Sequence, residues 1–195
     1  MPANHSPKQE LRAQVRQRLG AIDPADWARA SVQVCRRLVE RFPRPACVMV
    51  YAPMAGEIDP GEAAMAWLGT GAVVCLPRVD WTARAMTPAR IDAWPGALVA
   101  SKHGVREPGP DAPSVGLDQL DVIVTPGLAF SPGGQRLGRG AGFYDRFLAR
   151  RERRAQAVGV ALDEQVIEHV PTDGDDVRLD SVCTPTRWLG PFHGR

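Results

Sequence analysis

Residues 122–148 read VIVTPGLAFSPGGQRLGRGAGFYDRFL, and this stretch decides the fold. It opens on an apolar run, Val122–Val124, that is typical of a buried strand, and from Phe143 onward apolar residues return at helical spacing. Six glycines lie between these two ends, among few side chains able to pack. Glycine lets the backbone approach a ligand closely and turn its N–H groups toward it. The stretch therefore predicts a strand, a glycine-rich loop and a helix start that together bind an anion.

Two arginines in this loop, Arg136 and Arg139, support the anion prediction, because a guanidinium is a planar fork of donors suited to phosphate or carboxylate oxygens. The loop does not match the common nucleotide loops. It lacks a Gly-Lys-Ser/Thr ending, and no acidic residue follows at the distance that a dinucleotide site requires. A glycine-rich loop can also be no more than a turn. The residues alone therefore indicate an anion site and leave the plain turn open.

Apolar runs of the kind found in buried parallel strands recur elsewhere, at 46–52, 72–76 and 157–162. Patterns typical of helices lie around them: from Pro7, from Pro24 to Phe42, from Pro60 to about Gly69, and over 143–154. Strands that alternate with helices predict an α/β fold with a mostly parallel open sheet and helices on both faces. The length of 195 residues, without a linker-like break, predicts a single domain over residues 1–195.

Composition excludes several classes of function. The net charge is only +2, so nothing marks the chain as a polyanion-binding protein, and the basic run 150–154 lacks the interleaved aromatic residues of a nucleic-acid site. No apolar run reaches the length of a membrane span, and no secretory signal is visible. We therefore expect a cytoplasmic protein with neither a membrane nor a nucleic acid as partner. The cysteines lie far apart in apolar segments and predict buried free thiols: Cys35, Cys47, Cys75 and Cys183.

The exact order of residues in the central stretch is more informative than the residue types alone, which indicate only an anion site. PGLAF at 126–130, followed by GQRLGRGAGFYDRFL at 134–148, closely resembles the signature of the 5-formyltetrahydrofolate cyclo-ligase family, also called methenyltetrahydrofolate synthetases. Shorter pieces are similar to other parts of that family: KQELR at 8–12, EID at 57–59 and GVREP at 104–108. Ser131 stands where members of the family usually have Asp, and Phe143 replaces the first of two tyrosines.

The resemblance implies an enzyme of one-carbon metabolism, an ATP-dependent ligase. In this family MgATP transfers a phosphoryl group to the formyl oxygen of 5-formyltetrahydrofolate. Nitrogen 10 then attacks the activated carbon, the ring closes and phosphate leaves, so that the products are 5,10-methenyltetrahydrofolate, ADP and phosphate. The protein's part in such a reaction is mainly to position the substrates and to neutralise charge.

The resemblance also implies which residues form the site. The nucleotide would bind to Lys8, Arg12, Gly134, Arg136, Leu137, Gly138, Arg139, Gly140, Ala141, Gly142, Phe143 and Tyr144. The folate would contact Ala52, Glu57, Arg78, Phe143 and Tyr144. Arg136 and Tyr144 would serve as catalytic residues. The aromatic and apolar residues Trp81, Met86, Trp94 and Pro95 are candidates for walls of a pterin pocket, with plain core packing as the alternative for each.

ATP as co-substrate requires Mg²⁺, which prefers one or two carboxylates together with phosphate oxygens and water. Asp145 follows the glycine-rich loop directly and is the first candidate ligand. The resemblance points to Asp180 as its distant partner, with Asp175 and Asp176 competing for that second position.

Two other functions stay open. One is a diverged paralogue that uses the same nucleotide loop on another acceptor, or that has lost catalysis. The other is a phosphate- or RNA-binding module without catalysis. For the enzyme we expect only small-molecule partners, 5-formyltetrahydrofolate and ATP, and a monomeric state.

Overall fold

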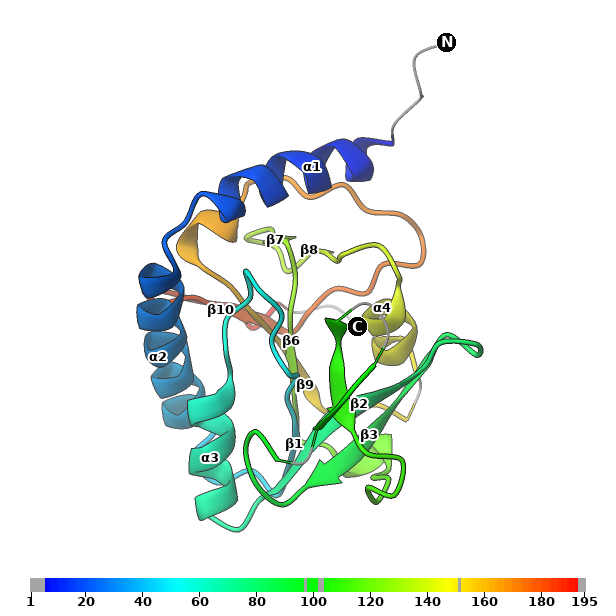
Figure 1. Ribbon diagram of the computed structural model, residues 1–195. Coiled ribbons are helices and arrows are strands. Elements are labelled where there is room, and N and C mark those ends of the chain that lie inside the picture. The colour runs from blue at the N-terminus through cyan, green and yellow to red at the C-terminus, as the bar shows by residue number, and fades with distance from the viewer. Residues whose placement is uncertain (1–5, 97, 102–103, 151, 193–195) are drawn as a thin grey trace.

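The computed structural model describes residues 6–96, 98–101, 104–150 and 152–192. Within these residues a seven-stranded sheet runs in the order β11-β10-β9-β6-β1-β2-β3 (Figure 1). The five inner strands are parallel, and only the edge strands β3 and β11 run antiparallel to their neighbours. The strands are β1 Cys47–Met49, β2 Val73–Asp80, β3 Ala85–Ile91, β6 Val122–Thr125, β9 Gln156–Val160, β10 Ser181–Cys183 and β11 Trp188–Leu189.

Helices cover both faces of this sheet, as expected from the sequence. The helices are α1 Pro7–Gly20, α2 Pro24–Arg41, α3 Gly61–Gly69 and α4 Phe143–Leu148, with short 3-10 turns η2 Leu117–Gln119 and η3 Asp163–Gln165. Neighbouring residues of β1 point to opposite faces. Val48 shares one buried cluster with Val34 of α2 and Trp67 of α3, whereas Met49 shares the other with Phe147 of α4. The prediction of an α/β fold with a mostly parallel sheet is confirmed.

Local sequence signals explain where the first helices begin. The carboxylate of Asp23 accepts a hydrogen bond from the Ala25 N–H at 2.7 Å, and Pro24 occupies the first helical position of α2. Ser6 caps α1 in the same way, in a capping box with Gln9. The predicted starts of both helices are therefore confirmed.

The strand predicted over 72–76 is longer than its apolar run, because β2 continues through Pro77 and Arg78 to Asp80. Its second half forms an antiparallel hairpin with β3, in which Arg78 pairs with Thr87. Pairing with a neighbouring strand, rather than burial of its own side chains, extends the strand there. The strand therefore does not end with its apolar run at 72–76, as the sequence pattern indicated, but continues to Asp80.

The helix after the glycine-rich stretch is shorter than predicted, since α4 ends at Leu148 and not at 154. The chain turns back at once. Arg153 donates from Nε to the Leu148 carbonyl at 3.1 Å, an acceptor that a longer helix would use, and from Nη1 to the Ala155 carbonyl at 2.8 Å. Arg151, part of the basic run noted above, lies outside the described residues.

Two small antiparallel pairs stand apart from the sheet, β4 Leu98–Ala100 with β5 Arg106–Pro108 and β7 Ala129–Phe130 with β8 Arg136–Leu137. The β7–β8 hairpin divides the glycine-rich stretch in two. In its turn, the Ser131 hydroxyl accepts hydrogen bonds from the backbone N–H groups of Gly133 and Gln135 at 3.2 and 3.1 Å. The remaining part, residues 138–142, is named the cradle loop below.

The four cysteines are free and buried, as predicted from their apolar surroundings. Burial raises the pKa of the Cys35 thiol to about 11, so it is protonated at neutral pH. In the part of the chain that the structure describes, no helix combines the length and apolar character that crossing a bilayer requires.

Asp163 ties the end of β9 to the segment after β10, and we expect it to make the stability of the protein pH-dependent. Its carboxylate accepts from the Thr184 hydroxyl at 2.6 Å, the Thr186 hydroxyl at 2.8 Å and the Arg187 Nε at 3.2 Å. Burial alone would raise the pKa of Asp163, but these hydrogen bonds outweigh it and the pKa lies below its usual value of 3.8. The unfolded chain therefore binds the proton more readily.

Asp163→Asn should lower the free energy of unfolding by about 1–3 kcal/mol at neutral pH. In the wild type this stabilisation is present above pH 3.8 and is lost as the pH falls through the lowered pKa of Asp163. Urea unfolding measures the free energy of unfolding of both proteins from about pH 7 down to about pH 3. The difference between the wild type and Asp163→Asn should shrink as the pH falls. Glu164→Gln, which neutralises the exposed neighbouring carboxylate, is the control. A difference between wild type and Asp163→Asn that does not change with pH would contradict the prediction.

Candidate active site

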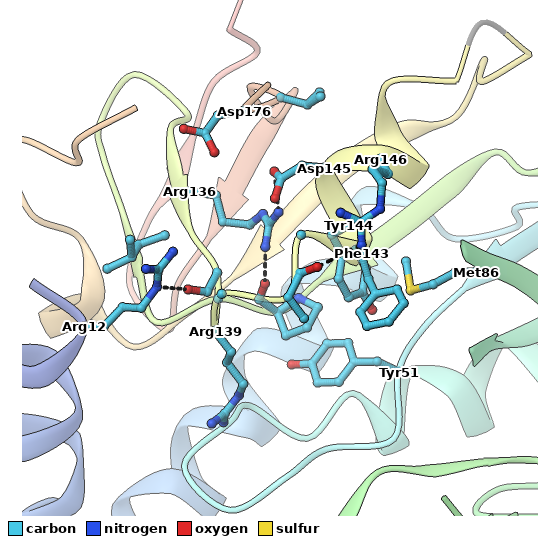
Figure 2. A pocket seen from close by; sticks show the side chains of 18 of the residues that line it. Arg12, Tyr51, Met86, Arg136, Arg139, Phe143, Tyr144, Asp145, Arg146 and Asp176 are labelled. Carbon is cyan, nitrogen blue, oxygen red and sulfur yellow. Dashed lines mark hydrogen bonds and ion pairs between the residues drawn. The ribbon is translucent and has the colours of Figure 1, made fainter. Parts of the chain in front are cut away.

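A cavity of about 1220 Å³ opens where α1, the cradle loop, the start of α4, the loop after β1 and the β2–β3 hairpin meet (Figure 2). Several of these segments follow the carboxyl ends of the parallel strands β1 and β6, the edge at which open α/β sheets bind ligands. Figure 2 shows Arg12 on one side of this space, and Met86, Tyr51 and Phe143 on the other. The cavity therefore has a cationic end and an apolar end.

Aromatic and apolar side chains of the β2–β3 hairpin and of α4 form the apolar end. The Trp81 ring meets the Phe143 ring edge to face, with 5.0 Å between centroids, and Met86 lies beside them in the cavity wall. The Arg146 guanidinium lies 5.3 Å from the Phe143 centroid and donates from Nε to the Arg84 carbonyl at 2.8 Å. These contacts fix the wall in a form suited to a flat aromatic ligand.

Two of the four residues predicted to wall a pterin pocket lie outside the cavity. Trp94 and Pro95 do not line the cavity. The Trp94 ring lies against Gly61 at the start of α3, where a Cβ atom would come within 2.2 Å of the indole nitrogen. Core packing, the alternative interpretation, holds for Trp94.

The cationic end is built by α1, which lies against the cradle loop. Arg12 donates from Nε to the Gly138 carbonyl at 2.9 Å, and Arg16 donates to the Arg139 carbonyl at 3.3 Å. Lys8, one turn before Arg12, also lines the cavity. The spacing of four residues puts these three cations on one helix face, and this face is the cavity wall. The predicted approach of the N-terminal segment to the glycine-rich loop is therefore found.

Lys8 is held by two carboxylates of the segment before β10. Its ammonium lies 2.7 Å from a carboxylate oxygen of Asp173 and also forms an ion pair with Asp176, and its side chain is only 13% exposed. Burial by itself lowers the pKa of Lys8. The hydrogen bonds to the two aspartates together raise it by a larger amount, so the pKa of Lys8 lies above the usual value. Lys8 is therefore cationic at neutral pH and is paired in this structure.

Arg136 is not an exposed anion-binding arm but a buried group. Its side chain is 4% exposed, its Nη2 donates to Asp145 at 2.7 Å, and the guanidinium lies 5.5 Å from the centroid of the Tyr144 ring. Among the described residues, Arg136 Nε has no hydrogen-bond partner. These contacts orient Asp145 and Tyr144 relative to each other at the start of α4.

The Tyr144 hydroxyl is buried at the cavity and, within the described part of the chain, makes no hydrogen bond. Burial, and next the negative charge of Glu57, raise the pKa of Tyr144 well above its usual value. The phenol therefore stays protonated at neutral pH, which suits it to donate a hydrogen bond and not to act as a base.

Glu57 and Arg139 form the ion pair that spans the cavity from the β1–α3 loop to the cradle loop. Arg139 Nε lies 2.8 Å from Glu57 Oε1, and the second carboxylate oxygen accepts from the Met54 N–H at 2.9 Å. The side chain of Glu57 is 8% exposed and that of Arg139 is 37% exposed. Arg139 also lies within 3.5 Å of the Ala55 carbonyl.

Glycine is required at two positions of the cradle loop. Gly140 and Gly142 have φ angles of +115° and +68°, which side-chain-bearing residues rarely adopt. A Cβ atom at Gly142 would also lie 2.8 Å from Nη1 of Arg146. At these two positions the loop presents only backbone to the cavity, although α4, with six residues, adds little of a helix dipole.

Most residues that the sequence assigned to the site do line this cavity: Lys8, Arg12, Ala52, Glu57, Arg136, Leu137, Gly138, Arg139, Gly140, Ala141, Gly142, Phe143, Tyr144 and Asp145. Gly134, Arg78 and Asp180 do not. Gly134 lies in the β7–β8 turn with a φ of +87°, where its carbonyl accepts from Leu179 and a side chain would meet Phe192. It supports the hairpin and not the cavity wall.

Arg78 and Asp180 are both occupied away from the cavity. Because β2 extends into the hairpin, Arg78 points to the loop before η2, where it donates to the carbonyls of Pro110 and Ala112 at 3.0 Å. Asp180 accepts from Arg153 at 2.9 Å and from the Ala157 N–H at 2.7 Å. The expectation that Asp180 joins Asp145 is therefore corrected, since its carboxylate anchors β10 to β9.

The carboxylates that do share the cavity with Asp145 include both competitors considered from the sequence, Asp175 and Asp176. Among the described residues no three His, Cys, Asp or Glu side chains gather into a metal cage. Two carboxylates at the cationic end of the cavity would fit Mg²⁺, which takes its other ligands from phosphate and water. The donor set thus suits an ion that arrives with a nucleotide.

Tyr51, Arg16 and Asp173 are among the cavity residues that sequence reasoning did not assign to the site. Tyr51, fully buried in the loop after β1, donates its hydroxyl to the Ile58 carbonyl at 2.6 Å and so shapes the loop that carries Glu57. Its place at the carboxyl end of a predicted strand was the available signal. Arg16 was detectable from its spacing of four from Arg12. Nothing in the sequence marked Asp173 as a partner of Lys8.

Comparisons with known proteins agree with this geometry. The model of the 5-formyltetrahydrofolate cyclo-ligase family matches residues 4–185. The chain is similar to a protein named 5-formyltetrahydrofolate cyclo-ligase from Mycolicibacterium smegmatis, with 40% identity over 73% of this chain and 75% of the relative. It is also similar to the protein of that name from Escherichia coli, with 33% identity over 89% and 97% of the two chains.

Solved structures show the same likeness. The Aquifex aeolicus 5,10-methenyltetrahydrofolate synthetase superposes with a TM-score of 0.81 at 29% identity, covering 96% of this chain and 94% of the other. A synthetase from Mycoplasma pneumoniae, at 20% identity and a TM-score of 0.74, shares the fold over 92% of this chain and 99% of the other. Because the family model matches almost the whole chain and a relative of that name is 40% identical over 73% of it, this chain belongs to the 5-formyltetrahydrofolate cyclo-ligase family.

Proposed function

We propose that this protein catalyses the ATP-dependent cyclisation of 5-formyltetrahydrofolate to 5,10-methenyltetrahydrofolate, with release of ADP and phosphate. One observation carries the proposal beyond family membership. A single cavity joins a cationic, glycine-rich end to an apolar end walled by Trp81, Met86 and Phe143. A phosphoryl donor and a flat folate therefore fit side by side in one space, as direct phosphoryl transfer between them requires.

The cationic end is the proposed nucleotide site. The backbone of the cradle loop, with Lys8, Arg12 and Arg139, would bind the phosphates, because N–H groups and guanidinium forks are the donors that phosphate oxygens accept. Arg136 is assigned a positioning role, since its guanidinium is buried and paired with Asp145. This differs from the phosphate-binding and catalytic role that the family resemblance implies for Arg136.

The apolar end is the proposed folate site. The pterin would lie against Phe143 and beside Ala52, where the carboxylate of Glu57 can accept hydrogen bonds from pterin N–H groups. The free, protonated hydroxyl of Tyr144 is a hydrogen-bond donor at the boundary of the two ends, where the formyl oxygen would receive the phosphoryl group. No covalent nucleophile is required.

The proposed Mg²⁺ ligands are Asp145 and Asp176, which both line the cationic end. A bound Mg²⁺ ion would neutralise phosphate charge. The chain's own contribution is to hold Asp145 in place through Arg136 and to keep Lys8 beside Asp176. Asp180 has no place in this assignment, because its carboxylate is bonded to Arg153 and to the backbone of β9.

We further propose a monomer that works in the cytoplasm on small molecules, without a nucleic acid partner. The low net charge of +2 supports the part of this proposal that excludes a nucleic acid partner, because it provides no broad positive field for a polyanion.

The decisive assay follows the absorbance of the methenyl product after 5-formyltetrahydrofolate is mixed with the purified protein. We expect product only when MgATP is present, with one ADP formed for each methenyl group. Omission of ATP is the control for spontaneous cyclisation. ATP binding without methenyl formation would favour a paralogue that acts on another acceptor, and RNA binding without turnover would favour the non-catalytic module. Either result would overturn the proposed activity.

A further inference from the structure

Several of the proposed ligand-binding side chains already form ion pairs with one another or with neighbouring carboxylates in this structure. Among the described residues of the cavity, Lys8 pairs with Asp173 and Asp176, Arg136 pairs with Asp145, and the remaining pair is Glu57 with Arg139. The first two pairs lie within the cationic end. The pair between Glu57 and Arg139 alone among them joins a group assigned to the folate with a group assigned to the nucleotide.

Both oxygens of Glu57 are engaged in this state. Oε1 accepts from Arg139 at 2.8 Å and Oε2 accepts from the Met54 N–H at 2.9 Å, and the side chain is more than nine-tenths buried. Removing the partner of this carboxylate is costly, because little water reaches Glu57 to replace the lost charge. A ligand that takes only one member therefore leaves the other member without its counter-charge.

Arg139 is the member that can move. Its side chain is 37% exposed and its second contact, to the Ala55 carbonyl at 3.5 Å, is long. Its backbone is held separately, since Arg16 donates to the Arg139 carbonyl and Arg12 donates to that of Gly138. The guanidinium can thus turn toward a phosphate while the cradle loop stays in place.

We propose that the Glu57–Arg139 ion pair couples the two substrates: an anionic phosphate takes Arg139, which frees a carboxylate oxygen of Glu57 for the N–H groups of the folate, and the folate in turn frees Arg139. This inference rests on the proposed function. The first ligand to bind must break the ion pair. The second ligand binds a side chain that has already been released and does not bear this cost. Binding is therefore positively cooperative, and the coupling is the same whichever ligand binds first.

Titration calorimetry with a non-hydrolysable ATP analogue and Mg²⁺ measures this coupling, in the absence and presence of saturating 5-formyltetrahydrofolate. For the wild type we expect the folate to tighten analogue binding about tenfold, within the usual range of coupling between sites. In Glu57→Gln the amide keeps the shape of the side chain but not its charge. The analogue alone should then bind several-fold more tightly than to the wild type, because Arg139 is already released.

The same variant separates the ion pair from direct contact between the two ligands. Contact between phosphate and folate would persist in Glu57→Gln, whereas coupling through the pair would not. We expect folate to change analogue affinity in this variant less than about twofold. A separate titration of the variant with 5-formyltetrahydrofolate measures its folate affinity. The folate concentration is then raised until the variant is saturated.

Asp173→Asn is the matched control. It also neutralises a carboxylate that pairs with a cavity cation, Lys8, but that pair does not reach the apolar end. The analogue should bind slightly more tightly, and the effect of folate on it should equal that in the wild type. Coupling lost equally in both variants would overturn the inference, because any change of charge in the cavity would then suffice.

The outcomes also distinguish this inference from the proposed function. Two substrates that bind and react, but with no coupling in the wild type or with full coupling in Glu57→Gln, overturn the inference and leave the enzymatic activity intact. A protein that neither binds nor converts 5-formyltetrahydrofolate overturns the proposed function, and the inference with it.

Discussion

Asp145→Asn is expected to lower kcat about 100- to 1000-fold while the protein stays folded. The carboxylate lies at the first turn of α4, faces the cationic end of the cavity and is held by Arg136 at 2.7 Å. An amide of the same shape keeps a hydrogen-bond acceptor but loses the charge that a Mg²⁺ ligand needs. The loss of several kcal/mol of charge stabilisation in the transition state corresponds to this range of rates.

The measurement is the steady-state formation of the methenyl product at several Mg²⁺ concentrations. Asp176→Asn, at the other proposed ligand, should also lower turnover and should raise the Mg²⁺ concentration required. Asp180→Asn serves as the control outside the cavity. We expect it to lose about 1–3 kcal/mol of stability, through the Arg153 and Ala157 contacts, with turnover per folded molecule nearly unchanged. Full turnover in Asp145→Asn, or an equal loss in Asp180→Asn, would refute the metal assignment.

Arg136→Met is expected to cost about 3 kcal/mol of folding free energy, the usual range for breaking a buried ion pair by removing one partner. The guanidinium is 4% exposed and Asp145 is 19% exposed, so water cannot replace the lost charge fully. Methionine fills much of the vacated space, which separates the electrostatic loss from a cavity effect. Turnover should fall as well, because Asp145 and Tyr144 lose the group that orients them.

A double-mutant cycle tests this assignment. Because Arg136→Met leaves the Asp145 carboxylate unpaired, adding Asp145→Asn should restore roughly 1–2 kcal/mol of the lost stability, although the double variant stays inactive. Unfolding in urea measures all four proteins. Arg90→Met is the control. Arg90 lies on β3 and forms an exposed ion pair with Asp92, so its loss should change the free energy of unfolding by less than about 1 kcal/mol. Strictly additive losses at Arg136 and Asp145 would show that the pair does not act as a unit.

Three cations of the cavity are paired before any ligand arrives. Lys8, Arg136 and Arg139 each have a carboxylate partner among the cavity-lining residues. Unpaired cations at such partly buried positions would destabilise the folded chain. The proposed substrates would therefore exchange partners with existing ion pairs, and the affinity for each substrate is a difference between two sets of contacts.

Local signals were sufficient for much of the fold. The apolar runs marked four of the five parallel strands, all but β10, and Asp23 with Pro24 marked the start of α2, because capping and burial act within a few residues of the chain. The string at 134–148 also marked the cradle loop, since positive φ angles at Gly140 and Gly142 require glycine itself. Such features depend on residue type and spacing.

Other features depend on partners that are distant in the chain. Whether β2 ends at Arg78 or continues is decided by its pairing with β3, and the short α4 is decided by the return of Arg153. The family resemblance favoured Asp180 over Asp175 and Asp176 as the partner of Asp145, and residue type and spacing could not reveal that Asp180 binds Arg153 instead.

By itself, then, the sequence determined the class of fold, the family and the loop that faces the cavity, because apolar periodicity and glycine conformation are local properties. Only the tertiary structure decided which charges meet. It directs Asp180 to Arg153, Asp176 to Lys8 and Glu57 to Arg139, since side chains more than twenty residues apart become neighbours only when the sheet and α1 close around the cavity.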